Sequence, residues 1–326
     1  MNSNRVSLAI CGAGRFVSRR ILPVLDICDN IKLTSVIRRS EKPDNPIISG
    51  IKEYSSLEAF LETSPSGVIY IATPNYLHAQ QSLQCLSAGL HVLCEKPMAT
   101  TSADCKKMIQ KATERNLHLQ IGHQLRYSAA LKLAKYWILN SEIGEISKIQ
   151  IVFNYDLPVS SRYWAYQPDF SGGCCLMDAG VHCIDTIRFL IDGPVALLQA
   201  KTDRSLYEDD LERIAECSFV IDNVKSYISI NAQTAYATVL TITGTNGEIV
   251  IDNFAASWGT VNVKMREADH GPLIKEEWVD VSAIYADQIQ SFSEHTVKSE
   301  INYSQAIDAA ENIKIIEDLY SISQNL

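Results

Sequence analysis

Two short motifs bring together an amine, a carboxylate and an imidazole. The first is Glu95-Lys96-Pro97, which directly follows an apolar run typical of a buried strand. The second follows Gly172-Gly173 and contains Asp178 and His182. An ammonium group polarises an alcohol or carbonyl oxygen, and an imidazole exchanges protons near neutral pH. These residue types suit a hydride-transfer reaction on a small polar substrate.

Asp185 extends the second motif. On an α-helix, its spacing from Asp178 and His182 predicts that all three lie on one face. A lone histidine on a helix is more often structural, whereas a histidine between two acids is a better proton-transfer candidate. Three roles for Asp185 stay open: a direct role in the reaction, an orienting role behind the reacting groups, or a solvated helix position.

The first part of the chain alternates apolar runs with amphipathic segments. Strands are expected at residues 6–11, 32–37, 68–72, 91–94 and 117–121, and helices at 15–27, 57–62, 77–88 and 102–115. Continuous apolar strands separated by helices predict a parallel sheet covered on both faces. We therefore expect a doubly wound, Rossmann-type dinucleotide-binding domain over residues 1–122.

The pattern changes after Gly122. Helices are expected at residues 127–139, 178–191, 284–297 and 305–322, with alternating strands from 146 and between 195 and 265. The Asn-Gly pair at 246–247 predicts a hairpin. Residues 123–326 are thus expected to form an α+β domain for substrate binding and oligomerisation. Its sheet should be open, mixed and mainly antiparallel. Its exposed apolar face should come from alternating residues such as Ile228, Ile230 and Ala232, or from Val239 and Thr241 with Leu240 and Ile242 opposite.

A glycine-rich turn joins the first strand to the first helix. The first glycine permits a tight turn, and the second lets the backbone approach a pyrophosphate at the helix N-terminus. Val17 occupies the third position of the fingerprint, which loosens the match. The expected contacts to the nucleotide are Gly12, Ala13, Gly14, Arg15 and Phe16.

The other expected cofactor residues follow later strands. Arg38, Arg39 and Ser40 stand where an acid usually holds the ribose, so they favour NADP over NAD; the alternative is a solvated basic loop. Ends of parallel strands line the ligand crevice of such sheets. The residues expected in this crevice are Thr73, Pro74, Asn75, His78, Glu95 and Lys96.

Composition excludes several classes of protein. The chain has 326 residues, a net charge of −9, 46% hydrophobic residues and 21% charged residues. An acidic chain is a poor nucleic-acid binder, and no apolar run is long enough to span a membrane.

Nine cysteines without a C-x-x-C pair, and a polar N-terminus, favour a cytoplasmic protein. No metal is expected, and a redox role for Cys174 and Cys175 is the less favoured reading.

In these motifs the chain resembles the glucose–fructose oxidoreductase / inositol dehydrogenase family. The resemblance rests on Gly12-Ala13-Gly14, on residues 72–78 and 89–97, and on Gly172-Gly173 through His182 and Asp185. It implies that Lys96, Asp178 and His182 are the catalytic trio. In the family the Lys–Pro bond is often cis, so a cis bond is expected before Pro97. It also implies sugar, sugar-nucleotide or cyclitol substrates, and dimers or tetramers formed through the open sheet. Val17 and Arg38 are the departures from the family pattern.

The loop at residues 159–170 contains aromatic side chains that suit the C–H faces of sugar rings, although ordinary loop packing is an equal alternative. The expected substrate contacts are Lys96, Arg126, Tyr163, Trp164, Asp178 and His182.

Three classes of function compete. The first is an NAD(P)-dependent oxidoreductase of sugars or cyclitols, with NADP favoured. The second is a catalytically silent, nicotinamide-sensing regulator, which would not need Lys96, Asp178 and His182. The third is a reductase of a non-sugar substrate such as a dihydrodiol or tetrapyrrole, which would require a mostly apolar pocket.

Overall fold

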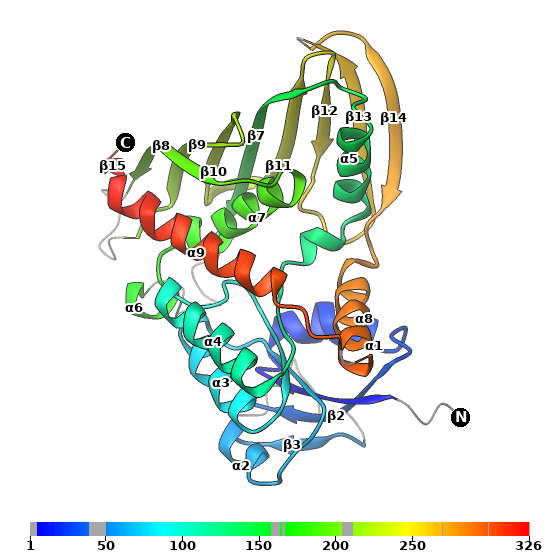
Figure 1. Cartoon of the computed structure of the whole chain (residues 1–326), viewed down its shortest axis with the longest axis vertical. Coiled ribbons are helices and arrows are strands. Elements are labelled where there is room, and N and C mark those ends of the chain that lie inside the picture. Colours follow the sequence, from blue (N-terminus) through cyan, green and yellow to red (C-terminus); the bar gives the residue numbers. More distant parts are fainter. Residues whose placement is uncertain are drawn as a thin grey trace. The chain divides into compact units, whose positions relative to one another are not determined.

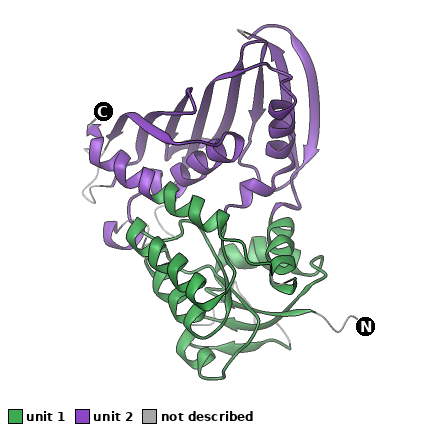
Figure 2. Cartoon of the chain, viewed as in Figure 1, with its two compact units in different colours: residues 1–122, 285–313 green, residues 123–284, 314–326 purple. Residues whose placement is uncertain are grey.

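The computed structural model describes residues 5–38, 50–157, 164, 167–203, 211–268, 270–298 and 300–325. The chain forms two compact units (Figure 2). Unit 1 comprises residues 1–122 and 285–313, and unit 2 comprises residues 123–284 and 314–326.

Unit 1 contains a parallel sheet of six strands in the order β3-β2-β1-β4-β5-β6. The strands are β1 (Val6–Cys11), β2 (Ile31–Ile37), β3 (Lys52–Tyr54), β4 (Val68–Ile71), β5 (His91–Cys94) and β6 (Leu119–Ile121). The helices are η1 (Val17–Ile21), α1 (Leu22–Leu25), α2 (Leu57–Leu61), α3 (Asn75–Ser87), α4 (Ser102–Arg115) and α8 (Ile284–Val297). The expected Rossmann fold is confirmed. The sequence did not predict β3, because this three-residue strand is largely exposed and lacks an apolar run.

The structure groups residues 285–313 with unit 1, whereas the sequence assigned them to the second domain. The reason is side-chain packing. The ring of Tyr285 packs edge-on against Phe16, with 5.7 Å between ring centroids. Phe292 stacks on His118 at 5.3 Å. Sequence order therefore does not follow the packing here, since helix α8 returns to the nucleotide-binding fold.

Unit 2 contains a mixed sheet of nine strands in the order β14-β13-β12-β11-β7-β10-β9-β8-β15. Its strands are β7 (Ile146–Asp156), β8 (Val195–Asp203), β9 (Ile214–Ile221), β10 (Val224–Asn231), β11 (Gln233–Gly244), β12 (Gly247–Asp252), β13 (Thr260–Glu267), β14 (Leu273–Asp280) and β15 (Gln324–Asn325). Neighbouring strands are antiparallel except for the pairs β7–β10 and β8–β15. The expected mainly antiparallel sheet is confirmed, as is the hairpin between β11 and β12.

The helical elements of unit 2 are short apart from α5 and α7. They are η2 (Gln124–Tyr127), α5 (Ala129–Leu139), α6 (Pro168–Ser171), η4 (Leu176–Gly180) and α7 (Val181–Leu190), together with the second part of α9 (Ser304–Ile322). Helices α5 and α7 lie against one face of the nine-stranded sheet (Figure 1).

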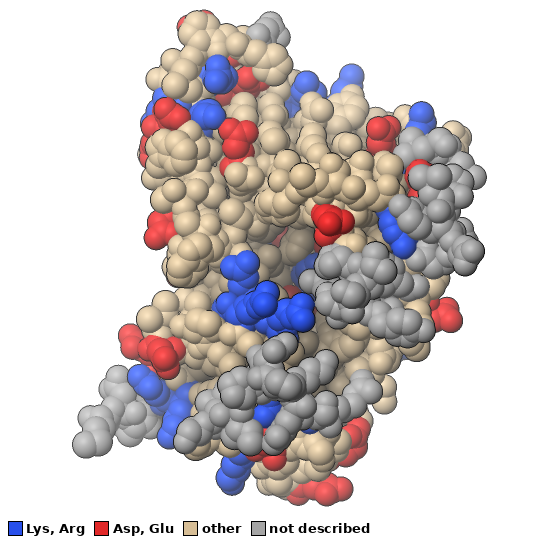
Figure 3. Space-filling view, turned by 180° about the vertical axis from the view of Figure 1, so that it is seen from behind, with Lys and Arg blue, Asp and Glu red and all other residues tan. Residues whose placement is uncertain are grey.

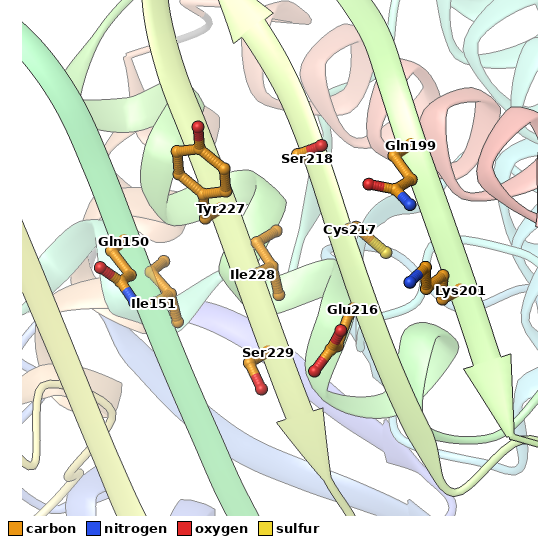
Figure 4. A pocket seen from close by; sticks show the side chains of 10 residues that line it. All are labelled: Gln150, Ile151, Gln199, Lys201, Glu216, Cys217, Ser218, Tyr227, Ile228 and Ser229. Carbon is orange, nitrogen blue, oxygen red and sulfur yellow. The ribbon is translucent and has the colours of Figure 1, made fainter. Parts of the chain in front are cut away.

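The apolar side chains of the sheet face these helices. Ile228, Ile230 and Ala232 are at most 2% exposed, so the expectation that they form an exposed apolar face is wrong. Successive strand residues point to opposite faces, so Tyr227 and Ser229 lie on the open face. Figure 4 shows polar side chains of that face around a shallow pocket of about 220 Å³ on β7, β8, β9 and β10.

Candidate active site

The turn after β1 fits a nucleotide pyrophosphate. Gly12 has φ = +92°, and a Cβ on it would lie 2.6 Å from the backbone carbonyl carbon of Ala72, so only glycine fits. A Cβ on Gly14 would meet only the carbonyl oxygen of Gly12, at 3.8 Å, which leaves its backbone open to a ligand. Strand β1 lies between β2 and β4, where the strand order reverses. Ligands of open α/β sheets bind at this point.

The residues after the turn depart from the expected pattern. Val17 is fully buried where the fingerprint has glycine, and the helix continues as a π-helix to Ile21. The ring of Phe16 packs on Tyr285. The Arg15 side chain is exposed, while Ala13 is buried.

His78 connects the ends of β4 and β5. Its ring nitrogens lie 2.8 Å from the Thr73 carbonyl oxygen and 2.7 Å from the Pro97 carbonyl oxygen. It is 1% exposed, and burial lowers its pKa despite these two hydrogen-bonding partners. His78 therefore holds the two loops together, and its contact with the cofactor stays a prediction. The Lys96–Pro97 peptide bond between them is cis.

The other residues at these strand ends are also held in place. The Thr73 hydroxyl donates to Gln81 Oε1 at 2.7 Å. Pro74 is the N-cap residue of α3, and Asn75, its first residue, is 9% exposed.

Glu95 is held by its neighbours on both sides. The hydroxyl of Tyr70 on β4 donates a hydrogen bond to Glu95 Oε1, and the Lys96 backbone N–H donates to Oε2 at 3.3 Å. A Cβ on Gly122, after β6, would lie 2.9 Å from Oε1. Burial raises the pKa of both Glu95 and Tyr70, and the Tyr70 hydrogen bond and the Lys96 charge oppose the rise at Glu95. Tyr70 did not stand out as a site residue in the sequence; its signal is a hydroxyl within an otherwise apolar strand.

Arg38 already has an acidic partner. Its guanidinium donates from Nε to Glu53 Oε2 at 3.0 Å and from Nη2 to Oε1 at 2.9 Å. Glu53 was not predicted as a partner, because it lies on β3, a strand that the sequence pattern does not indicate. Arg39 and Ser40 lie outside the described residues. Figure 3 shows one group of Lys and Arg side chains on a face that also carries scattered acids, so the negative net charge does not exclude a local basic region.

In the helical motif of unit 2, Asp185 is paired with a side chain from another element. Asp178 lies in the π-helix η4 and is half-buried, and His182 lies in α7 and is 8% exposed. Asp185 is 1% exposed and receives hydrogen bonds from Arg126 Nε at 2.9 Å and Nη2 at 2.7 Å. This buried ion pair ties α7 to η2. Asp185 is therefore not a solvated residue, and Arg126, an expected substrate contact, is held by it.

The proposed trio draws on both units. Lys96 is half-buried in unit 1, whereas Asp178 and His182 belong to unit 2, so their meeting at one substrate stays a prediction. Trp164 is half-buried, and Tyr163 lies outside the described residues, as do Arg162 and Tyr166.

The described part of the chain gives little support for three other features: a metal site, a membrane-spanning helix and a reactive thiol. No group of three or more His, Cys, Asp or Glu residues there could hold a metal ion. None of the helices that the structure describes is long and apolar enough to cross a membrane. Both Cys174 and Cys175 are buried, and burial raises the pKa of Cys175, which disfavours a reactive thiolate.

Comparison with known proteins supports the resemblance. The chain is 28% identical over 226 residues to 1,5-anhydro-D-fructose reductase of Ensifer adhaerens, covering 67% of this chain and 66% of that protein. It is 25% identical over 252 residues to glucose-6-phosphate 3-dehydrogenase of Bacillus subtilis, covering 74% of this chain and 71% of that enzyme. The chain thus spans slightly less than two thirds of the anhydrofructose reductase.

The fold has close structural counterparts. A 3-ketoreductase of Actinomadura kijaniata, solved with NADP and TDP-benzene, superposes with a TM-score of 0.88 at 20% identity, covering 99% of both chains. At this identity the likeness establishes the fold.

Two family descriptions account for both parts of the sequence. Residues 6–123 match the oxidoreductase family with an NAD-binding Rossmann fold, and residues 131–250 match the GFO/IDH/MocA C-terminal domain. The chain therefore belongs to the GFO/IDH/MocA family of oxidoreductases.

Proposed function

We propose that this protein is an NAD(P)-dependent oxidoreductase acting on a hydroxyl or carbonyl carbon of a sugar, sugar derivative or cyclitol. One observation carries the proposal. Lys96 follows β5 at the same edge of the parallel sheet as the nucleotide turn Gly12–Gly14 after β1. An amine at that edge stands where the reacting end of a bound dinucleotide is expected.

Each candidate residue has a distinct role in this reaction. A nicotinamide cofactor held at the turn Gly12–Gly14 would supply the hydride chemistry. Lys96 polarises the substrate oxygen through its ammonium group, and His182 accepts the alcohol proton during oxidation and returns it during reduction. Asp178 accepts a hydrogen bond from a neighbouring hydroxyl and so orients the substrate.

Names of the related enzymes support the substrate class. They include a reductase of an anhydrofructose, a dehydrogenase of levoglucosan and a dehydrogenase of glucose 6-phosphate. The test is a panel of aldoses, anhydrosugars, sugar phosphates, sugar nucleotides and inositols, assayed in both directions with NADP(H) and NAD(H). Turnover of at least one member supports the proposal, and cofactor binding without turnover of any member would favour a nicotinamide sensor.

The first prediction concerns cofactor preference. We expect tighter binding of NADPH than of NADH, because Arg38 can bind the 2′-phosphate. Arg38→Asp should weaken NADPH binding by ~2–3 kcal/mol and affect NADH much less. Fluorescence titration of the two reduced cofactors measures both effects. Equal affinity of the unmodified protein for both cofactors would contradict the assignment.

Glu53 offers the matched control for this experiment. Because it forms an ion pair with Arg38, it competes with a phosphate for the guanidinium. Glu53→Gln should therefore tighten NADPH binding, whereas Arg38→Asp weakens it. If both substitutions changed NADPH affinity in the same direction, the pair would serve the local fold rather than cofactor choice.

The second prediction is self-association through the open face of the nine-stranded sheet. Tyr227 lies on this face and is 40% exposed. Trp278 is 66% exposed. It lies on the same face because it pairs with Asn262, which points away from the buried side chains of Val261 and Val263. Exposed tyrosine and tryptophan side chains are enriched at protein interfaces. Light scattering at micromolar concentration should give a dimer or tetramer mass, whereas 36.3 kDa would mean a monomer.

Substitutions locate the interface. Tyr227→Lys combined with Trp278→Lys should lower the measured mass. Tyr136→Lys is the control, because this residue is 58% exposed on α5, on the covered side of the sheet. An equal loss of mass in the control would place the interface elsewhere.

A further inference from the structure

Glu212 is a buried carboxylate beside the turn that leads into the helix of Asp178. It is 1% exposed. Its Oε1 accepts hydrogen bonds from the backbone N–H groups of Cys174 at 3.0 Å and Leu176 at 3.1 Å. Its backbone carbonyl accepts from the N–H of Cys175 at 3.2 Å. One residue thus binds three consecutive amides of this turn.

Tyr320 on α9 completes the arrangement. Its hydroxyl donates to the same Oε1 of Glu212 at 2.6 Å. A Cβ on Gly173 would lie 2.0 Å from the Tyr320 hydroxyl oxygen, and Gly173 has φ = +142°. The second glycine of the Gly172-Gly173 motif is therefore needed for the approach of this phenol.

Neutral hydrogen-bond donors offset the cost of removing the Glu212 carboxylate from water. Among the residues that the structure describes, no lysine or arginine forms an ion pair with Glu212. The first N–H groups of a helix lack intrahelical partners and favour a negative charge beside them. Burial raises the pKa of Tyr320, and the charge of Glu212 raises it further. The N–H groups of the turn therefore donate to a buried carboxylate rather than to water.

A short hydrogen-bonded path connects this acceptor to the proposed site. Cys174 donates its N–H to Glu212, and its carbonyl accepts from the Asp178 N–H at 2.9 Å. Burial raises the pKa of Tyr155, and the charges of Asp178 and, more weakly, Glu212 add to that rise. The two carboxylates therefore act on one phenol, which places Glu212 in the electrostatic surroundings of Asp178.

We propose that Glu212 and Tyr320 are positioning residues that hold the 172–176 turn, and with it Asp178 and His182, in the orientation needed for turnover. This inference rests on the proposed function. Neither residue belongs to the unit that carries the nucleotide turn, so their loss should affect the chemical step rather than cofactor binding.

Glu212→Gln and Tyr320→Phe test the inference. Gln keeps an acceptor oxygen but loses the charge, and kcat should fall by about 10- to 100-fold, as expected when reacting groups are displaced slightly. Tyr320→Phe should cause a smaller fall. KM for the cofactor should not change. Because both residues act through one oxygen, the double variant should resemble Glu212→Gln rather than the product of the two effects.

Matched controls separate positioning from general stability. Glu248 is 2% exposed in unit 2 and bonds to His270, so Glu248→Gln also removes a buried charge. Tyr303 donates its hydroxyl to the Ala112 carbonyl in unit 1, so Tyr303→Phe also removes one phenol hydrogen bond. Both controls should retain kcat. A kcat of Glu212→Gln that equals that of Glu248→Gln would overturn the inference.

Amide hydrogen exchange gives a readout that does not need turnover. Peptides covering residues 172–182 should exchange slowly in the unmodified protein and faster in Glu212→Gln, while peptides from β10 stay unchanged. Exchange in 172–182 that is equal in both proteins would overturn the inference. If the unmodified protein turned over no substrate of the panel, the proposed function would fail, while the exchange result would still decide whether Glu212 holds the turn.

Discussion

Lys96→Ala is expected to lower turnover by ~10²-fold or more while leaving the protein folded, which is the range for losing a positioned acid–base or polarising group. Lys96 is half-buried at the end of β5, and its backbone N–H donates a hydrogen bond to Glu95. Alanine removes the amine and leaves this backbone contact in place. The melting temperature should therefore stay within a few degrees, and the cofactor should still bind.

The measurement compares kcat for Lys96→Ala and Lys107→Ala with the best substrate of the panel. Lys107 belongs to the same unit, lies on α4 and forms an exposed ion pair with Asp104. It thus controls for the loss of one lysine charge. Lys96→Arg keeps the charge but places it on a planar, differently hydrated group, so it should restore little activity. Near-normal turnover of Lys96→Ala would refute the assignment.

His182→Asn is expected to lower alcohol oxidation strongly and to remove its dependence on pH. Oxidation needs a neutral imidazole that accepts the proton, so its rate should rise as pH rises through the imidazole pKa. Carbonyl reduction needs the protonated imidazole, so its rate should rise as pH falls. Asparagine preserves much of the shape and does not titrate. The fall in rate should lie in the ~10²–10⁴-fold range of general acid–base catalysis.

The pH profiles of kcat in both directions decide the role of His182. His270→Asn is the control, because His270 is also in unit 2 but its side chain is 85% exposed. That variant should keep both profiles. If His182→Asn retained full activity and the original profile, the proton would have to move through Lys96 or water instead.

Local sequence patterns predicted most elements of the fold. Strand β5 and helices α4 and α8 have the predicted bounds, because continuous apolar runs and helical periodicity are properties of neighbouring residues. The glycine at position 12 was predicted for the same reason, since a tight turn after a strand needs a residue that tolerates positive φ. The family motifs, too, are short and continuous.

Tertiary structure decided which polar residues meet. Asp185 left three roles open in the sequence, and its partner Arg126 is 59 residues away. Glu212 and Tyr320 attracted no attention as motifs, although they meet across 108 residues. Packing also decided which face of the large sheet the helices cover. The alternation of residues along a strand separates the two faces but does not say which of them is buried.

The sequence by itself therefore determined the fold class, the nucleotide turn and the types of group available for chemistry. Only the tertiary structure decided that Arg38 is held by Glu53, that His78 joins two strand ends, and that α8 packs in the nucleotide-binding unit. The physical reason is that local conformation depends on neighbouring residues, whereas ion pairs and buried hydrogen bonds depend on the desolvated contacts that distant segments make when they pack.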